Sequence, residues 1–496
     1  MQGNEILYKE LKSLKRDKFP NDYVLTVEYN FDIINNNNYP GNFLELFVKY
    51  LAEIDIPTFF VEVITSYKKI DRDLIYLNSI HNNGKIKYKN SKIDFKYTSE
   101  LKKDTFCILP WIHFYVNPQG NVLPCCNADE KITLGKYTNN NFDFNNKKIK
   151  KFRKNLLNNI EVPHCKTCYK KEKNNIKSPR KILNNFFAKE INNNLSDTVD
   201  PFKLKYIDIR LSNICNLKCR MCSGKFSNRI AQEEHDIWGV SKYLNQSNSL
   251  EHDEYFFKIV KEHRNWLERI YFAGGEPLIN PMHYKILDLL IENNNTDLEI
   301  FYNTNFSILK YKNNSVMEYW KKFKNIKVGA SIDLIGKQSN YVRNGVSYES
   351  LEKNYFLLKE NCPDINFFIT SVLSIFNSFN LCDLQKHWIE NNQLSPSRLS
   401  INVLSSPSEM SLKCLPLAFK DQVYNKIKEH INFLKTVGDS KTLINEWETA
   451  INFMYKEDHL YLLEKFFKDT DILDTHRNQQ FEEFFPEYKN LRSHIQ

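Results

Sequence analysis

Three cysteines lie close together in the middle of the chain, with the spacing C-x3-C-x2-C. They are Cys215, Cys219 and Cys222, and they follow a run of apolar and β-branched residues at 206–211. Three thiolates on one short loop can bind three irons of a [4Fe–4S] cluster and leave the fourth iron without a protein ligand. A small molecule can bind and react at such an open position. The alternatives for this triplet are buried structural cysteines and zinc ligands.

A second motif, Gly274-Gly275-Glu276-Pro277, follows the next strand-like run at 269–273. The chain has 13 glycines among 496 residues, so an adjacent pair is uncommon in it. Glycines have no Cβ atom, so the backbone can turn sharply there and approach a ligand closely. A Gly-Gly pair also marks ordinary turns, but Glu276 and the rigid Pro277 add groups that can line a site.

The elements that must position these motifs alternate along the chain. Strand-like runs are separated by longer stretches with helical spacing, such as 284–291 and 351–358. This alternation predicts βα units around a parallel sheet, with sites at the carboxyl ends of the strands. The predicted strands are 206–211, 269–273, 298–303, 326–332, 365–373 and 399–404. We therefore expect the cysteine loop, the glycine motif, Asn303-Thr-Asn305 and Ser331-Ile-Asp333 to meet at one mouth.

Residues 205 to about 405 resemble the radical S-adenosylmethionine (SAM) superfamily, whose fold is a partial (βα)6 barrel. The resemblance implies that Cys215, Cys219 and Cys222 bind a [4Fe–4S] cluster, and that SAM chelates its fourth iron. It also implies eight SAM contacts: Gly274, Gly275, Glu276 and Pro277 near the amino group, Asn303, Ser331 and Asp333 near the ribose or carboxylate, and Arg343 near the carboxylate. Met221 departs from the family, which usually has an aromatic residue before the third cysteine.

The chemistry that the resemblance implies is reductive cleavage of SAM to a 5′-deoxyadenosyl radical, which removes a hydrogen atom from a substrate. The cofactors carry this chemistry, and the protein supplies orientation and a dry cavity. The expected substrate is a peptide or protein side chain, or else a small molecule that is oxidised. The expected electron donor is a reductant such as flavodoxin or ferredoxin.

A second group of five cysteines lies upstream. Cys107 precedes a predicted hairpin, with strands at 113–116 and 121–123 and a turn at 117–120. The hairpin would bring Cys107 near the adjacent pair Cys125-Cys126. Residues 165–168 add a C-x2-C pair that can bind one metal or cluster. Adjacent residues of an extended segment point to opposite sides, so we expect only one of Cys125 and Cys126 to face a cluster.

The upstream cysteines resemble the twitch module, a shortened relative of the SPASM domain. The matching pattern is Cys107-x12-Gly120-x4-Cys125, followed by Cys165-x2-Cys168. It implies an auxiliary [4Fe–4S] cluster on Cys107, Cys125, Cys165 and Cys168, with Cys125 preferred over Cys126 for its spacing from Gly120. The module normally follows the barrel, whereas here it precedes it. A four-cysteine zinc site is the alternative. The isolated Cys362, Cys382 and Cys414 are expected in the core.

The composition excludes some classes of protein. The chain is 42% hydrophobic, which suffices for sizeable cores. It has neither a signal-peptide pattern nor an apolar run long enough to cross a membrane, so we expect a cytoplasmic protein without a membrane partner. Much of the formal net charge of +9 lies in residues 147–181. This stretch has few aromatic residues for base stacking, so nucleic acid is not the expected partner, and a solvated helical face that shields a negative cluster is the favoured interpretation.

Two other functions are kept as alternatives. The basic stretch at 147–181 would suit a radical SAM enzyme that modifies nucleic acid. A non-catalytic iron–sulfur or electron-transfer protein would bind clusters without using SAM, but it would have no need of the motif at 274–277.

We predict an α/β protein with four regions. Residues 1–100 form a small α/β region, with strands at 23–29 and 58–65 and a helix at 43–53. Residues 101–190 form the auxiliary-cluster module, and residues 200–410 form the partial barrel. Residues 411–496 are helical, as the spacing at 460–467 indicates.

Overall fold

The computed structural model describes residues 24–29, 60–65, 105–117, 119–137, 142–173, 178–191, 195–244, 250 and 253–495. The chain divides into two compact units, Met1–Lys102 with Ile182–Asn193, and Lys103–Lys181 with Asn194–Gln496. In the first unit, strands β1 (Val24–Tyr29) and β2 (Phe60–Thr65) pair in parallel, close to the two strands predicted there. The predicted helix at 43–53 lies outside the described residues.

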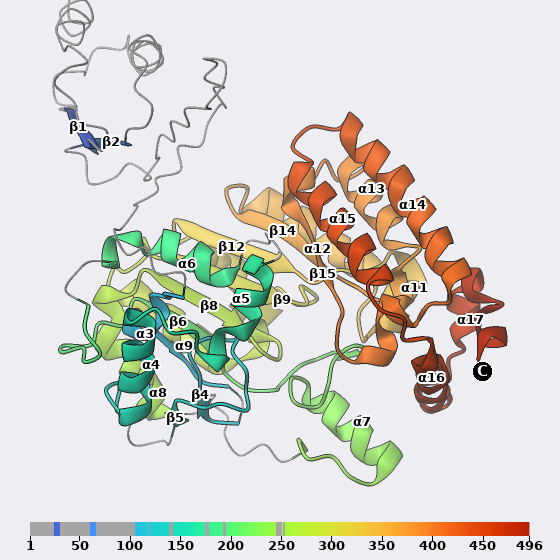
Figure 1. The fold of residues 1–496 in the computed structure, drawn as a ribbon, viewed down its shortest axis with the longest axis horizontal. Helices are drawn as coiled ribbons and strands as arrows, with labels where there is room; N and C mark the ends of the chain where they lie inside the picture. Colours follow the sequence, from blue (N-terminus) through green and yellow to red (C-terminus); the bar gives the residue numbers. More distant parts are fainter. Residues whose placement is uncertain are drawn as a thin grey trace, which may run out of the picture. The chain divides into compact units, whose positions relative to one another are not determined.

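A seven-stranded parallel sheet forms the centre of the second unit (Figure 1), in the order β15-β14-β12-β9-β8-β6-β3. Six of its strands are the predicted strands of the partial barrel, each within two residues of the expected ends. They are β6 (Tyr206–Arg210), β8 (Arg269–Ala273), β9 (Glu299–Thr304), β12 (Asn325–Ala330), β14 (Asn366–Leu373) and β15 (Leu399–Val403). The sheet has two edges, so the barrel is open, as the prediction required.

The seventh strand, β3 (His113–Tyr115), comes from the upstream cysteine-rich segment and extends the barrel sheet at the edge beside β6. His113 pairs with Tyr206, and their ring centroids are 4.3 Å apart. The predicted hairpin after β3 is present, with an antiparallel bridge between Val116 and Val122. A two-stranded ribbon of β4 (Asn121–Val122) and β5 (Gly135–Lys136) continues it. The upstream segment and the barrel therefore share one sheet.

Side chains alternate in burial along the barrel strands, which have a period of two. In β14 the residues that point outward, such as Phe367 and Ile369, are buried, and the inward ones, such as Phe368 and Thr370, are half-buried. The outward rings pack under helices, with Phe367 6.2 Å from Trp388 between ring centroids. The apolar outer face, and a lumen that contains both aromatic rings and polar groups, thus follow from the alternating sequence.

Helices precede the barrel and connect its strands. In and before the barrel they are α3 (Leu109–Ile112), α4 (Lys147–Leu157), α5 (Lys166–Lys173), α6 (Pro179–Phe186), α7 (Asn228–Trp238), α8 (Glu254–His263), α9 (Pro281–Glu292), α10 (Val316–Trp320), α11 (Gly336–Val342), α12 (Tyr348–Asn361) and α13 (Leu381–Glu390). The helical stretches predicted at 284–291 and 351–358 lie within α9 and α12.

The C-terminal region is helical, as predicted. It contains α14 (Leu417–Thr436), α15 (Lys441–Tyr455), α16 (Leu463–Arg477) and α17 (Phe481–Phe484), and α13, α14 and α15 lie side by side in Figure 1. Ile401 of β15 donates a backbone hydrogen bond of 2.7 Å to Glu446 of α15. Cys362, Cys382 and Cys414 are buried, as expected. No helix in the described part of the chain is long and apolar enough to cross a membrane.

Candidate functional site

The three cysteines of the central triplet lie on the loop that leaves the carboxyl end of β6. The loop turns back at Cys222, whose N–H donates to the carbonyl of Cys219 at 3.0 Å. A short strand, β7 (Lys218–Cys219), pairs with β13 (Arg343–Asn344) and fixes the middle of the loop. All three thiols are half-buried, and burial raises the pKa of Cys215 and of Cys222 to about 12. The three thiols are close enough for the charge on Cys219 or Cys222 to raise the pKa of Cys215 further.

Hydrogen-bond donors surround the sulfur atoms of this loop. The Leu217 N–H and the Asn305 amide lie 3.5 and 3.9 Å from the sulfur of Cys215. The Arg343 guanidinium lies 3.8 Å from the sulfur of Cys219, and its charge lowers the pKa of that thiol against the effect of burial. Donors around sulfur stabilise thiolates and tune an iron–sulfur cluster. The residues present therefore fit a cluster held by three cysteines.

The two glycines of the 274–277 motif support the cysteine loop. Gly274 has a φ of +111°, which favours glycine. A Cβ on Gly275 would lie 2.1 Å from the carbonyl oxygen of Ile214, just before Cys215. The Glu276 N–H donates to that same carbonyl at 2.8 Å. The close approach that the sequence predicted is therefore made, at Gly275, by the backbone of the cysteine loop.

The Glu276 carboxylate joins the ends of two neighbouring strands. It accepts hydrogen bonds from the Leu278 N–H at 3.1 Å, the Thr304 hydroxyl at 2.6 Å and the Asn305 N–H at 2.7 Å. Burial raises its pKa to about 7, although these three hydrogen bonds act in the opposite direction. Pro277 begins a buried 3-10 turn at Pro277–Ile279. Glu276 thus connects the carboxyl end of β8 to that of β9 through buried hydrogen bonds.

The remaining predicted SAM contacts lie at the carboxyl ends of β9 and β12, or beside the cysteine loop. Arg343 donates from Nε to Asp333 at 2.6 Å, and Asp333 also accepts from the Val372 N–H at 2.7 Å. Asp333 is 1% exposed, so it acts on the loop through Arg343. Asn303 donates to the Tyr271 hydroxyl at 2.6 Å, and Ser331 is half-buried at the end of β12. The structure therefore brings the predicted residues to one mouth.

A charged cluster inside the barrel was missed by the sequence analysis. Arg210 donates to both carboxylate oxygens of Asp208, at 2.8 and 3.2 Å, and its guanidinium lies 4.7 Å from the Tyr271 ring centroid. Ile207 and Ile209, between the charged residues, point outward and are buried. Charges at alternating positions of an otherwise apolar strand were the signal that could have found this cluster.

The upstream cysteines gather in the second unit. Cys107, Cys165 and Cys168 are buried, and Cys165 and Cys168 both act on the pKa of Cys107. Burial raises the pKa of Cys125 well above its usual value, and the nearby thiols of Cys126, Cys107 and Cys165 raise it further. Four cysteines are the ligand number of a fully ligated [4Fe–4S] cluster, and pairwise influences on pKa connect Cys107 with Cys165 and Cys168, and Cys125 with Cys107 and Cys165.

Cys126 packs against the same apolar cluster as Cys125, which consists of Tyr115, Leu123 and Ala128, but its polar neighbours differ. Its thiol is within hydrogen-bonding reach of Asp208 and Arg210, inside the barrel. The backbone turns between the two residues, and Ala128 closes the turn by donating to the Cys125 carbonyl at 3.1 Å. The geometry places Cys125 with the other upstream thiols and directs Cys126 toward the lumen.

A C-terminal helix, α16, binds the central cysteine loop through ion pairs and hydrogen bonds. Arg220, between the second and third cysteines, is fully buried and pairs with Asp474 of α16. Its guanidinium also lies 3.6 Å from the Tyr341 ring centroid. Arg477, one turn further along α16, donates to the Lys218 carbonyl at 3.0 Å and pairs with Glu233 of α7 at 2.6 Å. Nothing in the sequence pattern indicated this support.

Two family models match the regions just described. Residues 209–387 match the radical SAM superfamily, and residues 107–169 match the SPASM iron–sulfur cluster-binding domain. The chain thus contains a radical SAM domain, which spans most of its barrel. More particularly, it carries a SPASM-type domain in front of its barrel, and its cofactors are SAM, a SAM-binding [4Fe–4S] cluster and an auxiliary iron–sulfur cluster.

Several solved structures are similar to parts of the chain. The structure of anSMEcpe with bound AdoMet and Cp18Cys peptide is 20% identical, with a TM-score of 0.32, over 46% of this chain and 59% of that one. Streptococcus suis SuiB bound to precursor peptide SuiA is 15% identical, with a TM-score of 0.33, over 66% of this chain and 70% of that one. TYW1 with a lysine-pyruvate adduct is 14% identical, with a TM-score of 0.28, over 46% and 72%. No curated protein matches the chain in sequence.

Proposed function

We propose that the protein is a radical SAM enzyme that acts on a substrate bound in the barrel lumen. When bound, the cluster on Cys215, Cys219 and Cys222 supplies the electron that cleaves SAM to a 5′-deoxyadenosyl radical, which removes a hydrogen atom from the substrate. The observation that carries the proposal is the loop of three half-buried thiols at the mouth of the barrel. Its backbone is fixed by Gly275, Glu276 and β13.

The other predicted SAM-site residues divide into two roles in this proposal. Gly274, Gly275, Pro277, Asn303 and Ser331 line the mouth and contact SAM through backbone or side-chain groups. Glu276, Asp333 and Arg343 are positioning residues, because their polar atoms bind the ends of the strands and the sulfur of Cys219.

The substrate in this proposal is a peptide or protein side chain, with oxidation of a small molecule as the second candidate. The lumen offers the ionised Asp208–Arg210 pair, the Tyr271 ring and the Cys126 thiol. Ionised donors and acceptors in a partly dry cavity suit a polar substrate, because buried charges require polar partners. Cys107, Cys125, Cys165 and Cys168 would hold the auxiliary cluster, which would supply either an acceptor for one electron from the substrate radical or a group that helps to hold the substrate.

The proposed activity is tested by anaerobic reconstitution with iron and sulfide, followed by dithionite and SAM. The wild-type protein should form 5′-deoxyadenosine, and Cys219→Ala should abolish it because one cluster ligand is lost. The control is Cys126→Ser, which leaves the triplet intact and should keep the cleavage. If the fully loaded wild-type protein cleaves no SAM, the proposal fails and the chain is a non-catalytic iron–sulfur protein.

The two adjacent upstream cysteines provide a separate test of the auxiliary site. The wild-type protein should hold about eight irons per chain, for two [4Fe–4S] clusters. Cys125→Ser should lose about half of this iron, whereas Cys126→Ser should keep all of it, because only Cys125 lies with the other upstream thiols. About four irons and one zinc in the wild-type protein would contradict the assignment.

A further inference from the structure

A strongly basic surface lies on the two helices that flank the upstream cysteines. Residues 147–173 contain nine lysines and one arginine but only two glutamates, a net charge of +8 in a chain whose formal net charge is +9. The segment includes α4, a 3-10 turn at Pro163–Cys165 and α5. The net charge of this one segment is therefore almost as large as that of the whole chain.

The folding of the two helices leaves these lysines at the surface. α4 buries Ile149, Phe152, Arg153 and Leu156, and α5 buries Cys168 and Tyr169. The exposed positions on the opposite sides are mostly lysines, which we call the basic face: Lys147, Lys148, Lys151, Lys154, Lys166, Lys170, Lys171 and Lys173. Glu172 does not neutralise this face, because it is bound to Arg180 and Ser178 below it.

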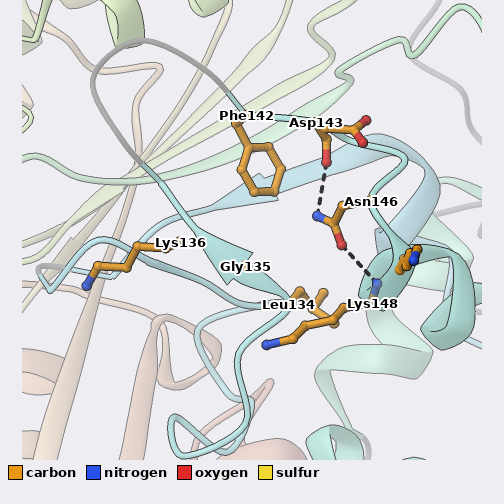
Figure 2. A pocket seen from close by; sticks show the side chains of 8 residues that line it. Leu134, Gly135, Lys136, Phe142, Asp143, Asn146 and Lys148 are labelled. Carbon is orange, nitrogen blue, oxygen red and sulfur yellow. Dashed lines mark hydrogen bonds between the residues drawn. The ribbon is translucent and has the colours of Figure 1, made fainter.

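A ring contact connects α4 to the turn before α5, and a hollow lies at the start of α4. The ring of Phe152 in α4 packs against His164, next to the start of α5, with centroids 4.8 Å apart. A hollow of about 550 Å³ lies at the beginning of α4, and Lys136, Lys147 and Lys148 are among the residues that line it (Figure 2). The surface thus combines positive charge with a shallow hollow.

The basic face lies directly over two of the upstream cysteines. Cys165 immediately precedes α5, and Cys168 is buried on that helix, on which Lys166 and Lys171 are exposed. An α-helix with its side chains is about 10–12 Å across. A protein bound to this face would therefore lie about one helix diameter from these two sulfur atoms.

We propose that the basic face docks a small acidic electron-carrier protein, which exchanges single electrons with the auxiliary cluster. The inference rests on the assignment of Cys165 and Cys168 as ligands in the proposed function. The step moves one electron from the reduced carrier to that cluster, so the carrier is oxidised by one electron and no covalent bond forms or breaks. Charge complementarity of this kind accelerates association and makes it sensitive to salt.

Nucleic acid is the less favoured occupant of this face. Proteins that bind single-stranded nucleic acid stack bases on exposed aromatic rings between their basic residues. The two aromatic residues of the segment, Phe152 and Tyr169, are 3% and 6% exposed. A lysine-rich surface without such rings over a redox site is better suited to an acidic protein.

The test uses the reconstituted full chain and a reduced bacterial flavodoxin with an acidic surface as the probe. Stopped-flow absorbance measures the second-order rate constant of cluster reduction at several salt concentrations. The double variant Lys166→Glu/Lys171→Glu should lower this constant at least tenfold at low salt, and the difference should shrink at high salt. The matched control, Lys435→Glu/Lys441→Glu on α14 and α15, makes the same change of charge at exposed lysines elsewhere and should lower it far less.

The outcomes separate this inference from the proposed function. Dithionite needs no docking surface, so it should reduce every variant equally, and iron counting should give about eight irons in each. If this holds and the flavodoxin rate does not depend on Lys166 and Lys171, or falls equally in the control, the docking site is wrong although the clusters are present. Missing auxiliary iron in the wild-type protein would overturn this inference and the auxiliary-cluster assignment, whereas the proposed SAM cleavage is tested by 5′-deoxyadenosine formation. A single-stranded RNA oligonucleotide provides the other comparison. If the Lys166→Glu/Lys171→Glu variant loses binding of this RNA but is reduced by flavodoxin as fast as the wild type, the face binds nucleic acid.

Discussion

Two pairs of adjacent, identical residues have members with different surroundings. One is the glycine pair beside the central cysteine loop, and the other is the cysteine pair of the upstream group. Gly274 requires glycine because of its φ of +111°, whereas Gly275 requires it because the Ile214 carbonyl occupies the space of a side chain. Cys125 lies with the other upstream thiols, and Cys126 faces Asp208 and Arg210. A motif predicts which residue types a site needs, and the fold decides what each of them touches.

Gly275→Ala should damage the SAM-binding cluster site. The new Cβ would lie 2.1 Å from the Ile214 carbonyl oxygen, so the cysteine loop has to move. We expect a loss of about 3 kcal/mol of stability, at the upper end for overpacking, and loss of about half of the iron. Iron content and thermal unfolding measure the two effects.

Gly438→Ala is the matched control for this substitution. A Cβ there meets no atom within 4 Å, so stability should change by about 0.5 kcal/mol or less, as for ordinary surface substitutions. Equal iron content and equal melting temperatures for the two variants would show that the tight contact at Gly275 is unimportant.

At the scale of elements, helix α16 positions the central cysteine loop from 254 residues away in sequence, through Arg220 and Asp474. Arg477 on the same helix extends this support to Lys218 and Glu233. The C-terminal region, for which the sequence indicated only helices, is therefore part of the scaffold of the cluster site.

Asp474→Asn should loosen this scaffold. The substitution leaves the buried Arg220 guanidinium without its counterion, and breaking a buried ion pair typically costs about 3–5 kcal/mol. We expect a lower melting temperature and less iron at the SAM-binding site, with the auxiliary cluster retained.

Asp469→Asn on the same helix is the control, because Asp469 pairs with Lys465 at the surface. An exposed pair contributes about 0–1 kcal/mol, so this variant should unfold and load iron like the wild type. If Asp474→Asn behaves in the same way as Asp469→Asn, α16 does not support the cysteine loop.

The barrel strands could be predicted from sequence because each leaves a local signal, an alternating apolar run that ends at a turn or a polar motif. Strand β3 was expected only as part of a hairpin. Its parallel pairing with β6 joins His113 to Tyr206 across the intervening module, and parallel pairing between distant segments leaves no local pattern. The same limit applies to the ion pair of Arg220 with Asp474, whose residues meet only in the folded chain.

The whole molecule contains several histidines that are buried in the neutral state. Burial lowers the pKa of His113 and of His430 to about 4, and that of His283 to about 3. Burial alone lowers the pKa of His283, whose Nε2 lies 2.9 Å from the Tyr302 hydroxyl. Each of these residues resists protonation only while the protein is folded.

Acidification from about pH 6.5 to pH 4 should therefore destabilise the protein. Across this window the unfolded chain binds protons at these histidines and the folded chain does not, so stability rises with pH and is lost as pH falls. Each histidine contributes up to about 3 kcal/mol.

Thermal unfolding across this pH range provides the measurement, with His283→Phe as the comparison. The variant removes one ionisable group from a pocket lined by Phe272 and Tyr302, so its melting temperature should fall less steeply with acid than that of the wild type. Identical slopes would contradict the prediction.

The shared sheet has a consequence for synthesis on the ribosome, where domains generally fold in order from the N-terminus. Strand β3 emerges first, but its neighbour β6 follows 93 residues later. During that interval β3 exposes an unpaired edge, and such edges invite aggregation. The module with five of the cysteines therefore reaches its final packing only after the barrel has begun to form, so the nascent chain would need protection at this edge before either cluster is enclosed.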